Sequence, residues 1–500
     1  MKRKVKGSLT VFFAMIMVCV MTLMFAMAEC IRVYELDSFS QEYTDMAVES
    51  AFSEYNPYLW KNYRILALDL GYGSELTGPS LLSQKALEYC KYNSNIEYGS
   101  NFARLVPTGC EVTGYSLLSD GSGQGVINLG VKATKEGLPA QVINEIQSEM
   151  AEVNNLKNTD VESQTNAGKE SLANAKNELA LAKENAANDN DDSTNPEDFG
   201  EPGEVEDNPL DAFDLMKEAV SHGILSTVIP ADKISDKEVD TSNLPSHRTL
   251  NAGNKEIANG NAITDKILIT DYFLSNYSYY GMDRNHGGMK YEVEYLLTGN
   301  ESDATCLAAV VGELLLIREA ANFTTIITSE EMMNQAREVA LILAGFTMNE
   351  GIVELVAVAI AGAWAYIEST LDVRLLLDGG EVSLIKTREE WTSDLLHLSA
   401  YFDVNSKAKP CKGKLGMTYK NFLMCMLALK GNDTLGIRAC DVMEVALNST
   451  EDYKNLKCDN LVFAADFKMN YSADEMFLSL FSNDKKGEGY CFAKEKSIIY

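Results

Sequence analysis

The stretch from Leu9 to Ala28 reads LTVFFAMIMVCVMTLMFAMA and contains no charged residue. As an α-helix it is about 30 Å long, which matches the hydrocarbon core of a bilayer. Only helices and closed barrels cross that core, because lipid offers no partners for backbone N–H and C=O groups. The stretch Leu9–Ala28 therefore predicts a transmembrane helix, and the lipid bilayer is the first partner that we expect.

The charges on the two sides of this run predict its orientation. Four basic residues precede it, and acidic residues follow it from Glu29 onward. Basic flanks stay on the cytoplasmic side of a membrane. We therefore expect a single-pass protein of the cell membrane, with residues 1–8 in the cytoplasm and the bulk of the chain outside.

A cleaved signal peptide is the alternative interpretation. Ala26-Met27-Ala28 has the small-x-small pattern of a cleavage site. However, the apolar run is longer than the usual 7–15-residue core of a signal peptide. Apolar residues also recur at helical spacing beyond it, and Pro57 is the first strong stop signal. We favour a retained anchor, and both interpretations export the rest of the chain.

The remaining sequence predicts an α+β fold, in which the transmembrane helix extends into an extracytoplasmic domain of helices and strands. The 500 residues contain 46% hydrophobic residues, enough for one or two sizeable cores. The expected segments are a cytoplasmic tail 1–8, the transmembrane helix 9–28, its continuation 29–56, a strand-rich segment 57–139, a polar helical segment 140–188, a disordered acidic linker 189–209, a mainly helical core 210–455 and C-terminal strands 456–500.

Three patterns within these segments are specific enough to be checked. Residues 111–119 and 125–133 flank an Asp-Gly-Ser-Gly sequence and predict a β-hairpin. Residues 303–324, 329–346 and 350–377 predict helices. The last of these contains an uncharged run of thirteen residues, LVAVAIAGAWAYI, which is too short to span a membrane and predicts a buried core helix.

Composition excludes several partners and chemistries. The formal net charge of −30 argues against binding to nucleic acid, because its phosphates would be repelled. The ten cysteines include no Cys-x-x-Cys pair; those in the last hundred residues fit either one or two disulfides or buried thiols. We predict no catalytic residue, no cofactor and no metal, since no catalytic motif occurs and the four histidines lack ligand spacing: His222, His247, His286 and His397.

Five charged residues in strongly apolar surroundings are candidates for structural ion pairs: Glu294, Arg318, Glu368, Asp372 and Arg374. Buried charges are costly unless they are paired. Glu368 and Asp372 are four residues apart, so they share one helix face and repel each other unless a cation from another segment lies between them. We predict that Arg318 pairs with one of them across a helix–helix contact, as a structural tie.

Six segments, in their order along the chain, resemble the domain-of-unknown-function 5702 family: GSLTVFF, AFSEYNPYLWKNYRILALDLGYG, KYEVEYLLTGNES, LLLIREAANF, WAYIESTLDVRLLLDGGEVSLIK and GMTYKNFLMCMLAL. That family is typical of Gram-positive bacteria, is associated with loci for pilus-like assemblies of the tight-adherence type, and has no established activity. The resemblance implies that other pilus or secretion components are partners, and it supplies no catalytic residue.

The N-terminus also resembles a pseudopilin in its short basic leader, Gly7 and apolar helix. Pilins usually carry a glutamate five residues after the processed glycine, where this chain has Phe12. We therefore expect a membrane-anchored, non-catalytic structural or assembly component of a pilus-like apparatus, rather than a major filament subunit. An extracytoplasmic binding or sensing module is the alternative, followed by a cell-envelope hydrolase.

Overall fold

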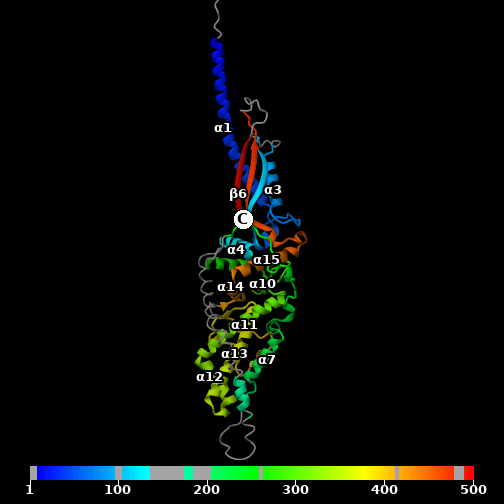
Figure 1. Cartoon of the computed structure of the whole chain (residues 1–500). Coiled ribbons are helices and arrows are strands. Elements are labelled where there is room, and N and C mark those ends of the chain that lie inside the picture. The colour runs from blue at the N-terminus through cyan, green and yellow to red at the C-terminus, as the bar shows by residue number, and fades with distance from the viewer. Residues whose placement is uncertain are drawn as a thin grey trace, which may run out of the picture. The chain divides into compact units, whose positions relative to one another are not determined.

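The computed structural model describes residues 8–95, 104–135, 174–182, 184, 204–257, 263–411, 416–477 and 489–500. The fold is α+β with a long apolar N-terminal helix, as expected (Figure 1). The chain divides into two compact units, which interleave along the sequence. Unit 1 comprises Met1–Leu129, Thr249–Asn259 and Glu451–Tyr500; unit 2 comprises Gly130–Arg248 and Gly260–Thr450.

Unit 1 is built around an antiparallel sheet whose central strand comes from the C-terminal part of the chain. Strand β5 (Leu461–Ala473) pairs with β2 (Val106–Leu117) along one edge. Along its other edge it pairs with β6 (Tyr490–Ile499) and, at its start, with β1 (Leu68–Asp69). The helical elements of this unit are α1 (Ser8–Phe52), α2 (Pro57–Tyr63), α3 (Ser80–Asn93), the start of α4 (Asp120–Lys135), η7 (Glu451–Tyr453) and η8 (Cys458–Asn460).

Helix α1 is continuous from the predicted membrane segment into the folded unit (Figure 1). The first half exposes apolar side chains, whereas the second half packs against α3 and β6. The helix ends at Phe52, a few residues before the predicted stop at Pro57. The reason is local: Asn56 caps the next helix, accepting hydrogen bonds from the backbone N–H groups of Tyr58 (2.9 Å) and Leu59 (3.1 Å).

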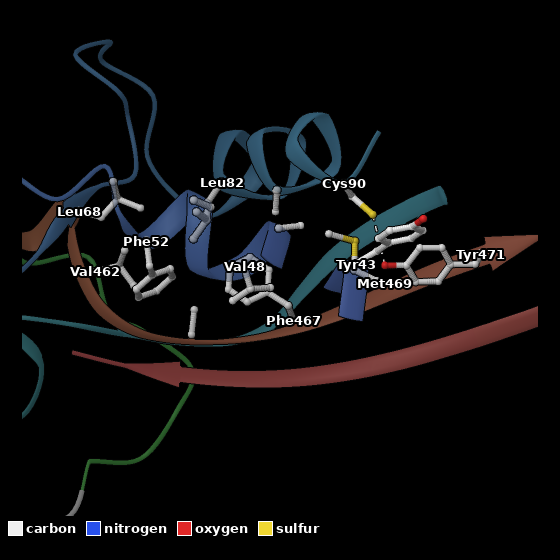
Figure 2. Close-up of a cluster of buried hydrophobic side chains, with 14 of the residues drawn as sticks. Tyr43, Val48, Phe52, Leu68, Leu82, Cys90, Val462, Phe467, Met469 and Tyr471 are labelled. Carbon is white, nitrogen blue, oxygen red and sulfur yellow. Dashed lines mark hydrogen bonds between the residues drawn. The ribbon is translucent and has the colours of Figure 1, made fainter. Parts of the chain in front are cut away.

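The core of unit 1 joins α1, α3 and β5 (Figure 2). Phe52 of α1 lies edge-on to Phe467 of β5, with ring centroids 6.0 Å apart. The Tyr471 hydroxyl lies 2.7 Å from the Thr44 hydroxyl and 3.2 Å from the Cys90 thiol, so these three polar groups satisfy one another within the core. The second half of α1 is therefore a structural element of the folded unit and not only a tether.

The predicted hairpin is wrong in its second strand. Residues 106–117 form strand β2, but Asp120–Lys135 is helix α4. The Asp-Gly-Ser-Gly turn exists, with φ of 58° at Gly121, 59° at Ser122 and 82° at Gly123. Asp120 accepts hydrogen bonds from the backbone N–H groups of Leu117 (2.7 Å) and Gly253 (3.0 Å), so the turn ends the strand and starts a helix. Segment 57–139 therefore holds more helix than strand over its described residues.

Unit 2 is mainly helical, and the three helices predicted from residue 303 onward are confirmed as α11 (Asp303–Thr328), α12 (Glu330–Ala344) and α13 (Glu350–Leu377). Helix α13 packs against both α11 and α12. The other elements of unit 2 are the end of α4, α7 (Pro209–Ser221), α8 (Ile224–Val228), η2 (Ala231–Lys233), η3 (Thr241–Asn243), α9 (Ile263–Asn276), α10 (Glu292–Thr298), η4 (Gly345–Thr347), β3 (Val382–Ser383), η5 (Arg388–Glu390), η6 (Leu398–Tyr401), β4 (Gly416–Met417), α14 (Tyr419–Leu429) and α15 (Asn432–Asn448).

Two helices among the described residues are long and apolar enough to cross a membrane, α1 and α13. The apolar window of α1 is fully exposed, whereas more than half of the window of α13 is buried inside the protein. The thirteen-residue uncharged run within α13 is almost entirely buried, as predicted for a core helix. By length, composition and exposure, α1 is the candidate membrane span.

Parts of two predicted segments lie outside the described residues. Most of the polar segment 140–188 falls there, although residues 174–182 are helical. The acidic linker falls there as far as residue 203. Near its predicted C-terminal end, Asp207 accepts hydrogen bonds from the Ser399 backbone (2.8 Å) and hydroxyl (2.7 Å), and Pro209 begins α7.

Candidate functional site

Four of the five predicted ion-pair residues lie on α11 and α13, and three of them meet in one buried cluster. A capping box at Ser302 starts α11, and Asn349 caps α13 through a hydrogen bond from the Gly351 N–H. These two helices pack against each other and bring Arg318 beside Asp372. Both side chains are fully buried.

Arg318 and Asp372 form the predicted pair. The Nε and Nη2 atoms of Arg318 donate to Asp372 Oδ2 at 3.1 Å and 2.9 Å. Arg318 Nη1 donates to the carbonyl oxygen of Leu384 at 2.8 Å. Asn322, one turn beyond Arg318, donates a third hydrogen bond to Asp372 Oδ2 at 2.9 Å. The prediction of a tie between Arg318 and one of the two acids is confirmed.

Lys386 is the cation that sequence reasoning missed. Its ammonium group forms an ion pair with Glu368 and another with Asp372, whose Oδ1 lies 2.5 Å from Nζ. Lys386 thus lies between two acids on one helix face, which would repel each other without a cation. The signal was present as a lone lysine in the apolar segment EVSLIK, which follows α13 and contributes strand β3. Two cations and two carboxylates give this cluster a formal charge of zero.

Hydrogen bonds and tryptophans enclose the cluster. Glu368 accepts from the backbone N–H groups of Thr392 (3.0 Å) and Ser393 (2.8 Å) and from the Ser393 hydroxyl (2.7 Å). The Trp364 indole donates to the same hydroxyl oxygen at 3.0 Å and lies edge-on to Trp391. These contacts leave the four charges paired and out of reach of a dissolved substrate. The arrangement fastens α11, α13 and the segment after β3 together.

Arg374 was predicted to form an ion pair, and the structure corrects this prediction. Its guanidinium donates to backbone carbonyl oxygens, at 2.8 Å to Thr227, 2.7 Å to Tyr401 and 2.8 Å to Asp403. Burial lowers the pKa of Arg374 to about 10, partly offset by the negative charge of Asp403. Arg374 follows Glu368 by six residues. At about 100° per residue, its side chain lies about 120° around the helix from Glu368 and therefore on another face. It anchors a loop instead of joining the cluster.

Glu294 is also fully buried, but among the described residues it accepts hydrogen bonds from neutral donors instead of pairing with a cation. Its Oε1 accepts from the Tyr280 N–H (2.9 Å) and from the Tyr419 hydroxyl (2.8 Å). Its Oε2 has no hydrogen-bond partner in the described part of the chain. Burial is the largest cause that raises the pKa of Glu294 to about 7, and the charge of Asp303 adds to the shift. The predicted ion pair is therefore replaced by a carboxyl group that is partly neutral near pH 7.

The remaining candidate ligands are dispersed. Within the described ranges, no group of three or more His, Cys, Asp or Glu side chains is placed to hold a metal ion. The structure records the ten cysteines as thiols. Of the five in the last hundred residues, Cys425, Cys440 and Cys458 are buried, as the core-thiol interpretation expects, whereas Cys411 is half-buried and Cys491 is exposed. His286 is the one histidine that is buried, and it contacts Glu292 at 2.9 Å.

A second site of interest lies on α1, where the apolar run ends. Glu29 and Arg32 are both buried, and their side chains pair at 2.8 Å. Glu29 also accepts from the Phe477 N–H at 2.7 Å, and Arg32 donates to the Asp474 carbonyl oxygen at 2.9 Å. The first charged residues after the apolar run are thus bound to the segment that leaves the end of β5. Sequence reasoning placed Glu29 outside the membrane but gave no sign of this contact.

The family comparison agrees with the resemblance seen in the sequence. The model of a family described as "Family of unknown function (DUF5702)" matches residues 200–473, which is more than half of the chain. The match includes every residue of the buried charge cluster. No curated protein and no solved structure matches the chain. By this match, the chain belongs to the family of unknown function DUF5702.

Proposed function

We propose that this protein is a single-pass membrane protein with a cytoplasmic N-terminus and its bulk outside. It serves there as a non-catalytic structural or assembly component of a pilus-like secretion apparatus of the tight-adherence type. The observation that carries the proposal is helix α1, which is an exposed apolar rod in its first half and part of a folded core in its second half.

This division of α1 supports anchoring over simple targeting. Leu36, Val48 and Phe52 are buried in the core of unit 1, whereas the side chains before Ala28 are mostly exposed. In water so many exposed apolar residues in one run are unfavourable, and a bilayer removes that cost. A rigid helix that continues from lipid into the fold holds unit 1 at the membrane surface.

The charge distribution supports the orientation. The basic residues lie before the apolar run, and acidic residues follow it along the rest of α1. The whole chain has a formal net charge of −30. Basic flanks favour the cytoplasmic side. An acidic domain is also repelled by anionic lipid headgroups, so it is held near the membrane by α1 and not by surface charge.

The buried charge cluster supports a structural role for unit 2. Arg318, Glu368, Asp372 and Lys386 neutralise one another and are enclosed by the fold. A hydrolase would need such acids to face a substrate. The link to tight-adherence assemblies rests on the family resemblance alone. The matched family is itself described as one of unknown function.

The experiment that tests this function is complementation of a gene deletion in cells that carry the natural locus. Wild-type protein should restore surface filaments counted by electron microscopy. A variant in which residues 1–28 are replaced by a cleavable signal peptide is exported without an anchor and should not restore them. A wild-type filament count in the deletion strain would contradict the assembly role while leaving the membrane anchor untouched.

A further inference from the structure

The segment that follows β5 lies against α1 at the end of the predicted membrane span. Glu29 accepts hydrogen bonds from the N–H groups of Met476 (3.4 Å) and Phe477 (2.7 Å). Arg32 binds the Asp474 carbonyl oxygen, as described above. Because Glu29 and Arg32 are buried and hydrogen-bonded, their charges are shielded at a place where unpaired charges would be costly. These contacts attach the end of β5 to α1.

An aromatic contact extends this attachment into the apolar run. The ring of Phe477 stacks on the ring of Phe25, with centroids 6.3 Å apart and planes 17° from parallel. Phe25 precedes Glu29 by one helical turn, about 6 Å along the axis. Phe477 therefore lies at the level of the apolar run Leu9–Ala28, before the first charged residue of α1.

Met476 is 39% exposed beside this contact, and Phe477 is partly exposed. An apolar side chain at this level meets lipid if α1 spans the bilayer, and contact with lipid removes its apolar surface from water. We propose that Met476 and Phe477 are a second membrane contact, inserted into the outer leaflet beside α1. The inference rests on the proposed membrane anchor and adds a lipid-binding surface formed by the residues that directly follow β5.

This contact would orient unit 1. Strands β5 and β6 are antiparallel, and Ala473 pairs with Tyr490 at one end while Ala464 pairs with Ile499 at the other. Nine residue steps of about 3.3 Å separate these two ends by about 30 Å. With Phe477 at the lipid boundary, the Ala473 end of the sheet faces the membrane and Ile499 points away from it.

The test uses full-length protein in phosphatidylcholine vesicles whose acyl chains carry bromine, which quenches tryptophan fluorescence on contact. The probes are Phe477→Trp and Met476→Trp, the second at a more exposed position that tolerates the change. Phe25→Trp reports on insertion of α1, and Ile499→Trp reports on the far end of the sheet. The native Trp60, Trp364 and Trp391 are present in every variant, so each is compared with unsubstituted protein.

We expect the tryptophans at 476 and 477 to lose as large a fraction of their emission as that at 25, while that at 499 is unaffected. Quenching at 25 without quenching at 476 and 477 would overturn the second contact and leave the anchor standing. No quenching at any position would overturn the anchor together with the inference. Equal quenching at 499 and 477 would overturn the specific insertion of this end of the sheet.

Discussion

Arg318 and Asp372 are completely buried, so removing one partner strands the other in the protein interior. We expect Arg318→Ala to lower the free energy of unfolding of unit 2 by about 3–5 kcal/mol, the range for breaking a buried ion pair. Lys386 stays next to Asp372 and Glu368, but one cation cannot neutralise two acids. Urea denaturation followed by the fluorescence of Trp364 and Trp391, which lie beside the cluster, measures the change.

The matched control is Arg337→Ala. Arg337 of α12 also pairs with an acid on α13, Glu354, through two contacts of 2.9 Å. Its side chain is 43% exposed and that of Glu354 50% exposed, so water solvates both charges. This substitution should therefore lower the free energy of unfolding far less than Arg318→Ala does. Equal effects of the two substitutions would show that burial does not decide the strength of the Arg318 tie.

Glu294 predicts a pH dependence of stability. Its pKa is about 7 in the folded protein, above the ordinary 4.5, because it is buried. Between these two pH values the folded state holds a proton that the unfolded state has released, so the free energy of unfolding falls as the pH rises. The pKa difference corresponds to a loss of about 3 kcal/mol at most.

Glu294→Gln keeps a neutral side chain at every pH and should remove this part of the pH dependence. Urea denaturation at pH 5 and pH 7.5 should therefore show a smaller loss of stability for this variant than for wild type. Glu338→Gln makes the same change at an exposed position of α12 and serves as the control. Identical pH slopes for wild type and Glu294→Gln would contradict the raised pKa.

The sequence predicted the Arg318 tie because one physical rule was sufficient there. Two acids four residues apart in an apolar helix require a cation, and the apolar neighbours of Arg318 marked it as buried. The same rule could not find Lys386, whose position depends on how the chain turns after α13. It also failed for Arg374 and Glu294, because backbone carbonyl oxygens and tyrosine hydroxyls satisfy charged groups without leaving a pattern in the sequence.

At the level of the element, α1 combines two environments in one helix. Phe52 is 2% exposed in the core of unit 1, and Phe13 is 61% exposed in the apolar run. We expect Phe52→Ala to destabilise unit 1 by about 3–5 kcal/mol, because it leaves a cavity against Phe467 and Tyr500. Phe13→Ala is the same chemical change on the same helix.

The substitution Phe13→Ala should alter unit 1 stability by less than about 0.5 kcal/mol, as is usual for an exposed side chain. Denaturation of both variants in detergent micelles, followed by the fluorescence of Trp60, compares them directly. Comparable losses from the two substitutions would mean that the first half of α1 is packed within unit 1.

Helices were easier to predict than strands for a physical reason. The apolar spacing of α11, α12 and α13 is local, and each helix satisfies its own backbone. The segment GVINLGVKA has no clear period, since its side chains from Val126 to Leu129 are nearly all buried, and the glycine-rich turn before it suits either a hairpin or a helix start. The pairing of β2 with β5 joins residues far apart in the sequence, such as Thr113 and Asp466, which are 353 positions apart, and no local pattern records it.

For the whole molecule, the two units interleave along the chain, so a division of the sequence into consecutive segments could not recover them. The N-terminal helix and the C-terminal strands were predicted separately, and the structure places both in unit 1. That arrangement gives α1 a role in folding, because the helix that carries the apolar run also completes the core around β5. A chain without α1 would lack the helix that packs against α3 and β5 in the core of unit 1.

The central claim is that α1 stays attached and spans the membrane. Protease added to cells stripped of their wall, followed by membrane fractionation and intact-mass analysis, tests it most directly. We expect untreated cells to hold a membrane-bound protein that still carries residues 9–28. The added protease should degrade the chain after about Glu29 and leave the apolar segment in the membrane. A soluble protein beginning at Glu29 would contradict the retained anchor.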